Sequence, residues 1–191
     1  MIPFRAFDPR VEVNGRTILS VLEAIPDYKE YALGVLEKNG IQGLHRGSWH
    51  AQQNWLDAFR DIAGEIGVFT LYAIGRCIPD SADWPSDVVT LEGGLASIDI
   101  AYHMNHRIGT VPMFDAETGK MVEGIGHYAV RKPGPGHADL VCDTPYPCDF
   151  DKGILAATAN KFKAARDIVS IRESPDCRKT GAPSCTYTVR W

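Results

Sequence analysis

The hydrophobic periodicity of this 191-residue chain changes near residue 108, and this change limits the possible folds more than any other feature. Before that point, apolar residues recur at the three-to-four-residue spacing of helices, most clearly at Trp55, Phe59 and Ile62. After it, short apolar runs alternate with polar residues between glycine and proline turns, as strands do. Such segregation predicts an α+β fold, in which an N-terminal helical half packs on a C-terminal antiparallel sheet.

No flexible linker separates the two parts, so we predict one ligand-binding domain over residues 1–191. Its helical part would span 1–108 and its α+β part 109–191. The second part is expected to open with a hairpin that turns at Gly119. Strands are then expected in HADLVCD, DIVSIRE and SCTYTVRW, with one inserted helix in DFDKGILAATANKFKA.

The composition excludes several classes of function. Apolar residues make up 45% and charged residues 23%, as in an ordinary globular domain. A net charge of −4 without any Lys/Arg block leaves no electrostatic footprint for nucleic acid. The N-terminus carries charges where a signal peptide needs an apolar region, and the apolar stretches are too short to cross a membrane. We therefore expect a cytoplasmic protein with neither nucleic acid nor membrane as a partner.

The cysteines raise a question of metal chemistry, because five thiols in a reducing compartment argue against a disulfide framework. Glu173 ends one predicted strand, and Cys177 and Cys185 flank the turn into the next. Upstream, Cys142 ends a strand and Cys148 precedes a helix, whose N-terminus favours thiolate. A hairpin can bring such groups to one end of a sheet, as zinc coordination requires. From spacing alone, a metal site, inert buried thiols and a redox pair all remain open.

A group of histidines and tyrosines marks a candidate pocket. His103 and His106 stand three residues apart near the end of a predicted helix, so they should share one face. One imidazole could enter a cavity between the helices and the sheet, or both could cap the helix C-terminus. Tyr102, His127 and Tyr128 are further polar candidates for a ligand-binding cavity with an otherwise apolar lining.

The C-terminal segment VSIRESPDCRKTGAPSCTYTV, with LVC and DKGIL upstream, resembles the signature of the 4-vinyl reductase domain family. The shared pattern is a strand, an Arg-Glu pair, a cysteine, a glycine-containing turn and a second cysteine. This family also supplies the sensor domains of aromatic-responsive bacterial transcription activators. The resemblance therefore implies a cavity for a small apolar or aromatic ligand, and a homodimer, which family members often form.

The same resemblance implies a structural zinc ion. Its ligands would be Glu173, Cys177, Cys185 and one upstream cysteine, either Cys142 or Cys148. This chain has one extra residue between the glutamate and the first C-terminal cysteine, and it has a second cysteine upstream. The identity of the upstream ligand therefore stays open.

The wider superfamily, of haem-NO-binding and TRAPP-like proteins, offers two alternatives. Its haem nitric-oxide/oxygen-binding domains place a histidine on a helix before the sheet and hold the haem propionates with a Tyr-x-Ser-x-Arg motif. Tyr128 fits the first position here, but Val130 and Lys132 replace the serine and the arginine. His103 or His106 would be the axial ligand of such a gas sensor.

The family name also suggests a tetrapyrrole-related reductase. The chain carries no P-loop, dinucleotide fingerprint or nucleophile motif, so an enzyme is the less favoured class. We expect a stand-alone binding or sensory protein with a structural zinc site, and a haem-binding gas sensor is the alternative.

Overall fold

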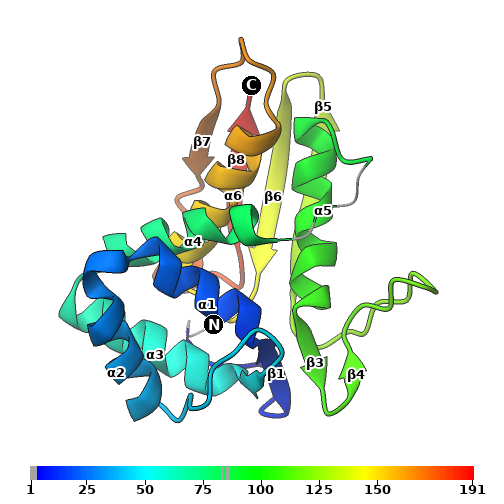
Figure 1. Cartoon of the computed structure of the whole chain (residues 1–191). Coiled ribbons are helices and arrows are strands. Elements are labelled where there is room, and N and C mark those ends of the chain that lie inside the picture. The colour runs from blue at the N-terminus through cyan, green and yellow to red at the C-terminus, as the bar shows by residue number, and fades with distance from the viewer. Residues whose placement is uncertain (1–3, 83, 85–86) are drawn as a thin grey trace.

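The computed structural model describes residues 4–82, 84 and 87–191, without the side chains of Ala24, Lys132 and Pro133, and Figure 1 shows its architecture. The helices are α1 (Gly15–Ala24), α2 (Lys29–Lys38), α3 (Gln52–Glu65), α4 (Phe69–Ser81), α5 (Leu91–Met104) and α6 (Cys148–Phe162). The strands are β1 (Val11–Asn14), β2 (Trp49–Ala51), β3 (His106–Ile108), β4 (Val111–Pro112), β5 (His127–Gly134), β6 (His137–Asp143), β7 (Ser170–Glu173) and β8 (Cys185–Arg190). The predicted α+β class is confirmed.

The C-terminal sheet has the order β5-β6-β8-β7, and every neighbouring pair is antiparallel. Alternation along β8 buries Cys185, Tyr187 and Val189 on one face, as the sequence predicts. Helix α6 follows β6 in the chain, packs against β8 and α4, and forms much of the contact between the two parts. The inserted helix of the prediction is therefore the element that joins the sheet to the helices.

Helices α4 and α6 meet backbone to backbone. A Cβ atom on Gly75 of α4 would collide with the carbonyl oxygen of Phe150, and one on Gly153 of α6 would collide with the carbonyl oxygen of Tyr72. Glycine inside a helix costs about 1 kcal/mol relative to alanine, and here the missing Cβ atoms allow the close approach of the two helices.

A second, smaller sheet lies within the part that was expected to be helical. It has the order β2-β1-β3-β4 and strands of two to four residues. Only β1 (VEVN) alternates, over just four residues, and the other strands are two or three residues long, so periodicity did not predict this sheet. Helix α3 consequently begins at Gln52, after β2.

The predicted helical face shared by His103 and His106 is wrong. Helix α5 ends at Met104, because Asn105 turns its backbone N–H and its side-chain amide back onto the carbonyl of Ala101. His106 is consequently the first residue of β3. Both imidazoles are buried, but they face different surroundings.

None of the described helices has the length and apolar character required to cross a bilayer.

Replacing Gly75 by alanine tests the α4–α6 contact. The added methyl must push the two backbones apart, so we expect Gly75→Ala to lower the free energy of unfolding by about 1–3 kcal/mol. Gly34→Ala in α2 is the matched control, because open space surrounds its Cβ position and alanine favours the helix by up to about 1 kcal/mol. Urea denaturation measures both; equal effects would contradict the packing argument.

Candidate functional site

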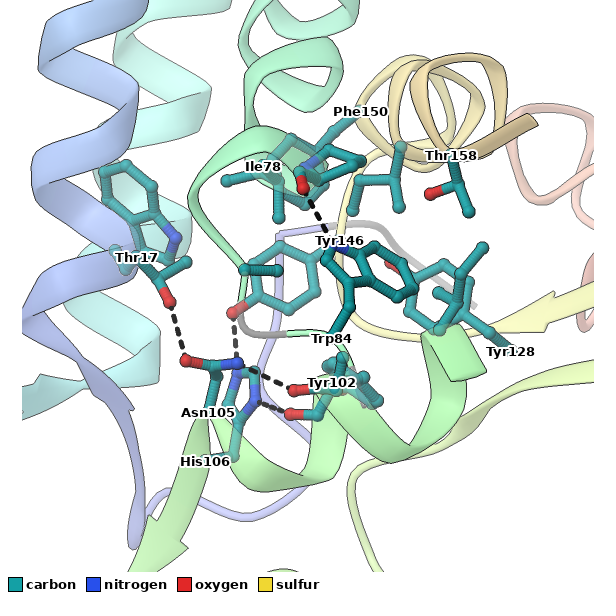
Figure 2. Close-up of a pocket in the computed structure, with 16 residues that line it drawn as sticks. Thr17, Ile78, Trp84, Tyr102, Asn105, His106, Tyr128, Tyr146, Phe150 and Thr158 are labelled. Atoms are coloured by element: carbon teal, nitrogen blue, oxygen red, sulfur yellow. Dashed lines mark hydrogen bonds between the residues drawn. The ribbon is translucent and has the colours of Figure 1, made fainter. Parts of the chain in front are cut away.

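A cavity of about 60 Å³ lies between α4 and α6 on one side and the C-terminal end of α5 on the other (Figure 2). Most of its wall is aliphatic or aromatic and includes Trp55, Ile78, Ile98, Phe150 and Ile154. The predicted candidates Tyr102, His106 and Tyr128 also line it, whereas His103 and His127 do not belong to its wall.

His106 is held as a neutral imidazole at the cavity wall. Its Nδ1 donates to the carbonyl oxygen of Tyr102 at 2.7 Å, which leaves the lone pair on Nε2. The hydroxyl of Tyr146 donates to that nitrogen at 2.8 Å. Burial lowers the pKa of His106 to about 4, so the ring is uncharged at neutral pH.

Tyr146 is a site residue that the sequence analysis missed. It stands between Pro145 and Pro147 in the segment that leads from β6 into α6, and this rigid connection fixes its position. Its hydroxyl also lies at hydrogen-bonding distance, 3.5 Å, from the side-chain amide of Gln52. The proline-flanked tyrosine was the available signal, but only the fold shows that it reaches an imidazole 40 residues earlier in the chain.

Two cavity-lining side chains carry buried polar atoms without a hydrogen-bond partner among the described residues. They are the indole Nε1 of Trp55 and the hydroxyl Oγ1 of Thr158. An unpaired buried polar group costs about 1–3 kcal/mol, and a bound molecule or water can satisfy it. The cavity therefore offers hydrogen-bonding capacity that the protein itself leaves unused.

A buried polar network leads from the cavity to the cysteines. The hydroxyl of Tyr128 donates to Oδ1 of Asp151 at 2.5 Å, and Oδ2 of Asp151 forms a buried ion pair with Arg178. Burial raises the pKa of Asp151 to about 6, although Arg178 opposes that shift. Arg178 also donates through its backbone N–H to the sulfur of Cys185 at 3.3 Å.

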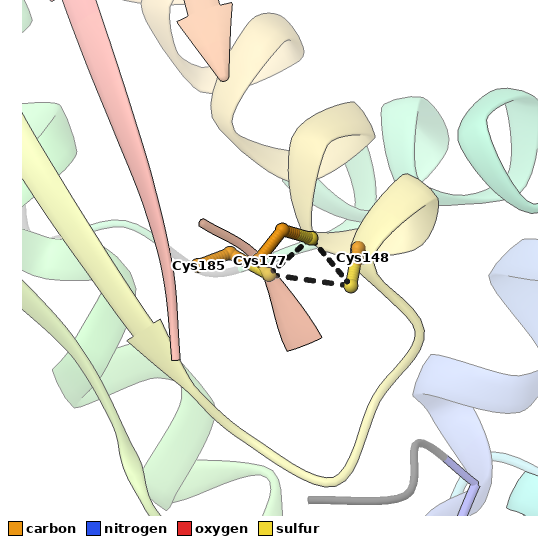
Figure 3. Close-up of side chains that lie close together, drawn as sticks. All are labelled: Cys148, Cys177 and Cys185. Carbon is orange, nitrogen blue, oxygen red and sulfur yellow. Dashed lines mark hydrogen bonds between the residues drawn. The ribbon is translucent and has the colours of Figure 1, made fainter. Parts of the chain in front are cut away.

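Three thiols converge at the end of this network (Figure 3). Cys148 begins α6, Cys177 precedes a short 3-10 helix (Arg178–Thr180), and Cys185 begins β8. Their sulfurs lie 3.0 Å (Cys177–Cys185), 3.2 Å (Cys148–Cys185) and 3.4 Å (Cys148–Cys177) apart. Hydrogen bonding with Cys148 and Arg178 lowers the pKa of Cys185 to about 4, so this sulfur is the preferred thiolate.

Glu173 lies beside the thiols, and Cys142 does not join them. Oε1 of Glu173 is 3.1 Å from the sulfur of Cys177. Cys142 is buried on β6 in register with Cys185, but it is outside the group of three converging thiols. Of the five predicted metal ligands, the structure therefore brings together Cys148, Cys177, Cys185 and Glu173.

His103 and His127 lie together at the junction of α5 and β5. Their ring centroids are 5.1 Å apart, and Asp99 lies against both imidazoles. Asp99 was not predicted as a site residue, since its position in the sequence resembles any polar residue on a helix.

Comparison with known proteins gives no match to a protein-family profile and no match among curated protein sequences. The resemblance to the 4-vinyl reductase family therefore gains no support from these comparisons. Solved structures do match. An H-NOX protein from Shewanella oneidensis in its Fe(II)NO ligation state has a TM-score of 0.65 at 16% identity, covering 93% of this chain and 98% of that one.

An oxygen-binding H-NOX domain related to soluble guanylate cyclases is similar as well. It has a TM-score of 0.61 at 13% identity, and the match covers 93% of this chain and 94% of that chain. At these identities the comparison establishes the fold, and the chain adopts the fold of H-NOX domains.

The neutral state of His106 predicts a specific pH dependence of stability. The unfolded state, with a histidine pKa near 6.5, binds more protons than the folded state, with a pKa of about 4. The contribution of His106 is therefore present above about pH 6.5 and is lost as the pH falls toward 4, by on the order of 3 kcal/mol. His106→Gln keeps an acceptor for Tyr146, and its free energy of unfolding should not show this loss. Urea denaturation at several pH values measures both proteins. The same pH dependence in wild type and variant would contradict a neutral, buried His106.

Proposed function

We propose that this chain is a sensor domain that binds a small, mainly apolar molecule in the cavity beside His106. The observation that supports the proposal most directly is the pair of buried, unpartnered polar atoms, on Trp55 and Thr158, in a mainly apolar wall. Pockets with few polar groups in an apolar lining are typical of ligand sites. The predicted homodimer and the cytoplasmic location stay predictions.

The size of the cavity limits the ligand. At about 60 Å³, it is less than half of the ~150 Å³ cavity that accepts benzene in an engineered protein. A molecule of a few heavy atoms fits this volume better than the aromatic compound implied by the family resemblance. The indole N–H of Trp55 can only donate, so a hydrogen-bond acceptor on the ligand would satisfy it.

Haem is the second candidate, and the matched structures favour it because one is described with an Fe(II)NO ligation state and another as oxygen-binding. The imidazole of His106 has suitable chemistry for an axial ligand. It is neutral, its Nδ1–H is fixed on the carbonyl of Tyr102, and its lone pair lies on Nε2.

Three other properties of the site do not fit a haem. Sites for drug-sized ligands occupy roughly 300–1,000 Å³, whereas this cavity has about 60 Å³. No lysine or arginine is among the described residues that line it, so the propionates would lack a cation there. Tyr146 also occupies Nε2 of His106. In this conformation the residues present therefore do not fit the group.

Two experiments on the purified protein test the small-molecule and the haem candidates, and the first is a ¹⁵N NMR titration. We expect acetone, a small acceptor-bearing probe, to shift the indole N–H resonance of Trp55 in ¹⁵N NMR spectra. Ala101→Leu adds volume at the cavity wall and should weaken the binding at least tenfold. Ala96→Leu on the exposed face of the same helix is the control and should bind as the wild type does.

The resonance of Trp55 is identified with Trp55→Phe. An unchanged indole resonance at saturating acetone would contradict the cavity proposal. Incubation with haem provides the second arm. A Soret band that disappears in His106→Ala would establish the haem candidate, whereas a protein that stays colourless would exclude it.

We further propose that Cys148, Cys177, Cys185 and Glu173 hold a structural zinc ion. Thiolates around tetrahedral zinc lie about 3.8 Å apart for Zn–S bonds of ~2.3 Å, so a small outward movement of the three sulfurs would admit the ion. The thiols come from the start of α6, the residue before the 3-10 helix and the start of β8. A metal there would join α6 to the turn between β7 and β8. Lys152 and Lys179, both within 4.0 Å of Glu173, compete for its carboxylate.

Serine substitutions test the zinc site. Cys177→Ser and Cys185→Ser should lose zinc in elemental analysis and melt at lower temperature, because structural zinc contributes directly to folding. Cys142→Ser and the half-buried Cys77→Ser on α4 are the controls and should retain the metal. Full zinc content in Cys185→Ser, or its loss in Cys142→Ser, would show that the ligand set is wrong.

A further inference from the structure

A second group of metal-ligating side chains lies apart from the cavity and the thiols. Asp99 and His103 belong to α5, and His127 begins β5. One potential ligand atom from each residue lies within 4.8 Å of the corresponding atoms of the other two. His103 and His127 were expected to line the ligand pocket, but neither does.

His127 is oriented by two carboxylates. Its Nδ1 lies 3.0 Å from Oδ2 of Asp99, and its Nε2 lies 2.8 Å from Oε2 of Glu123. A carboxylate that accepts one ring N–H of a histidine fixes the tautomer and leaves the other nitrogen for a metal. Glu123 is thus placed to orient the ring, while Nδ1 faces the carboxylate of Asp99.

His103 is buried and has unused coordination capacity. Its Nδ1 lies 2.8 Å from the carbonyl oxygen of Asp99, which can only accept, so the lone pair is on Nε2. Nε2 is buried and has no hydrogen-bond partner among the residues that the structure describes. The backbone carbonyl thereby plays the same orienting part for His103 that Glu123 plays for His127.

Asp99 is fixed in place between the two imidazoles. Its Oδ1 accepts the backbone N–H of Tyr128 at 2.9 Å, and the same oxygen lies 3.6 Å from Nδ1 of His103. Ligand atoms around a tetrahedral ion with bonds of ~2.0–2.1 Å are separated by about 3.3 Å. The separation of 3.0 Å between Nδ1 of His127 and Oδ2 of Asp99 is close to that value.

We propose that Asp99, His103 and His127 form a second metal site, for a divalent transition ion such as Zn²⁺, with Glu123 positioning His127. Two imidazoles and one carboxylate suit zinc and its neighbours rather than Mg²⁺ or Ca²⁺, which prefer oxygen ligands. The side chains of Asp99 and His127 are 20% and 33% exposed, so an ion there is accessible from solvent. Three protein ligands leave a fourth position for water or a small anion.

The test is a titration of the metal-stripped full chain with Co²⁺. We expect the wild type to bind one equivalent of Co²⁺ that gives no thiolate-to-cobalt charge-transfer bands, because the proposed site has no thiol. Any Co²⁺ bound by the cysteine cluster would show these bands. His127→Ala should lose only the Co²⁺ equivalent without the bands. Cys185→Ser should keep it, which separates this site from the thiol cluster and from the proposed zinc ion.

Two further variants make the assignment sharper. Glu123→Gln leaves the three ligands intact, and it should weaken Co²⁺ binding by about 10–100-fold, as loss of an orienting carboxylate does at other sites. His137→Ala, at the exposed first position of β6, is the matched histidine control and should bind as the wild type does. Circular dichroism confirms that each variant is folded.

The proposal would be overturned if folded His127→Ala bound the same number of Co²⁺ equivalents at the same affinity as the wild type. Absence of a band-free equivalent from the wild type would overturn it as well. With either result, Asp99, His127 and Glu123 would form an ion-pair network around a protonated His127, and no metal site. Neither result depends on what occupies the cavity.

Discussion

The buried ion pair between Asp151 and Arg178 is the interaction on which the arrangement of both candidate centres depends. Neither side chain has access to solvent, so removing one partner would leave an uncompensated charge at a cost of about 3–5 kcal/mol. Asp151 orients Tyr128 at the cavity wall, while Arg178 contacts Thr144 and the sulfur of Cys185. The cavity and the cysteine cluster are thus built around one charged pair.

Sequence periodicity predicted the elements that bury a continuous stripe or face. Helices α3, α5 and α6 and strands β6 and β8 have this property, and the α+β class followed from them. The small sheet of β1 to β4 was missed, because pairing between distant segments defines its strands and no local pattern does. The end of α5 was misplaced for a different, local reason: the side chain of Asn105 bonds back to the carbonyl of Ala101 and ends the helix.

The site residues likewise divide into those that the sequence predicts and those that only the tertiary structure brings together. Cys177, Cys185 and Glu173 surround one turn, so their proximity could be inferred from the chain. The choice between Cys148 and Cys142 needed the actual course of β6 into α6, which turns only Cys148 toward the other thiols. Tyr146 and Asp99 act on histidines through tertiary contacts, and no spacing rule connects them to their partners.

The glycine contact between α4 and α6 determines how the cavity can change shape. Backbone lies directly on backbone at Gly75 and Gly153, so no side chain there can rotate to let the two helices slide. The wall that carries Ile78, Phe150 and Ile154 therefore resists sliding of α4 against α6. A guest larger than the present volume would need movement elsewhere in the wall, where the last turn of α5 contributes Tyr102 and leads into His106.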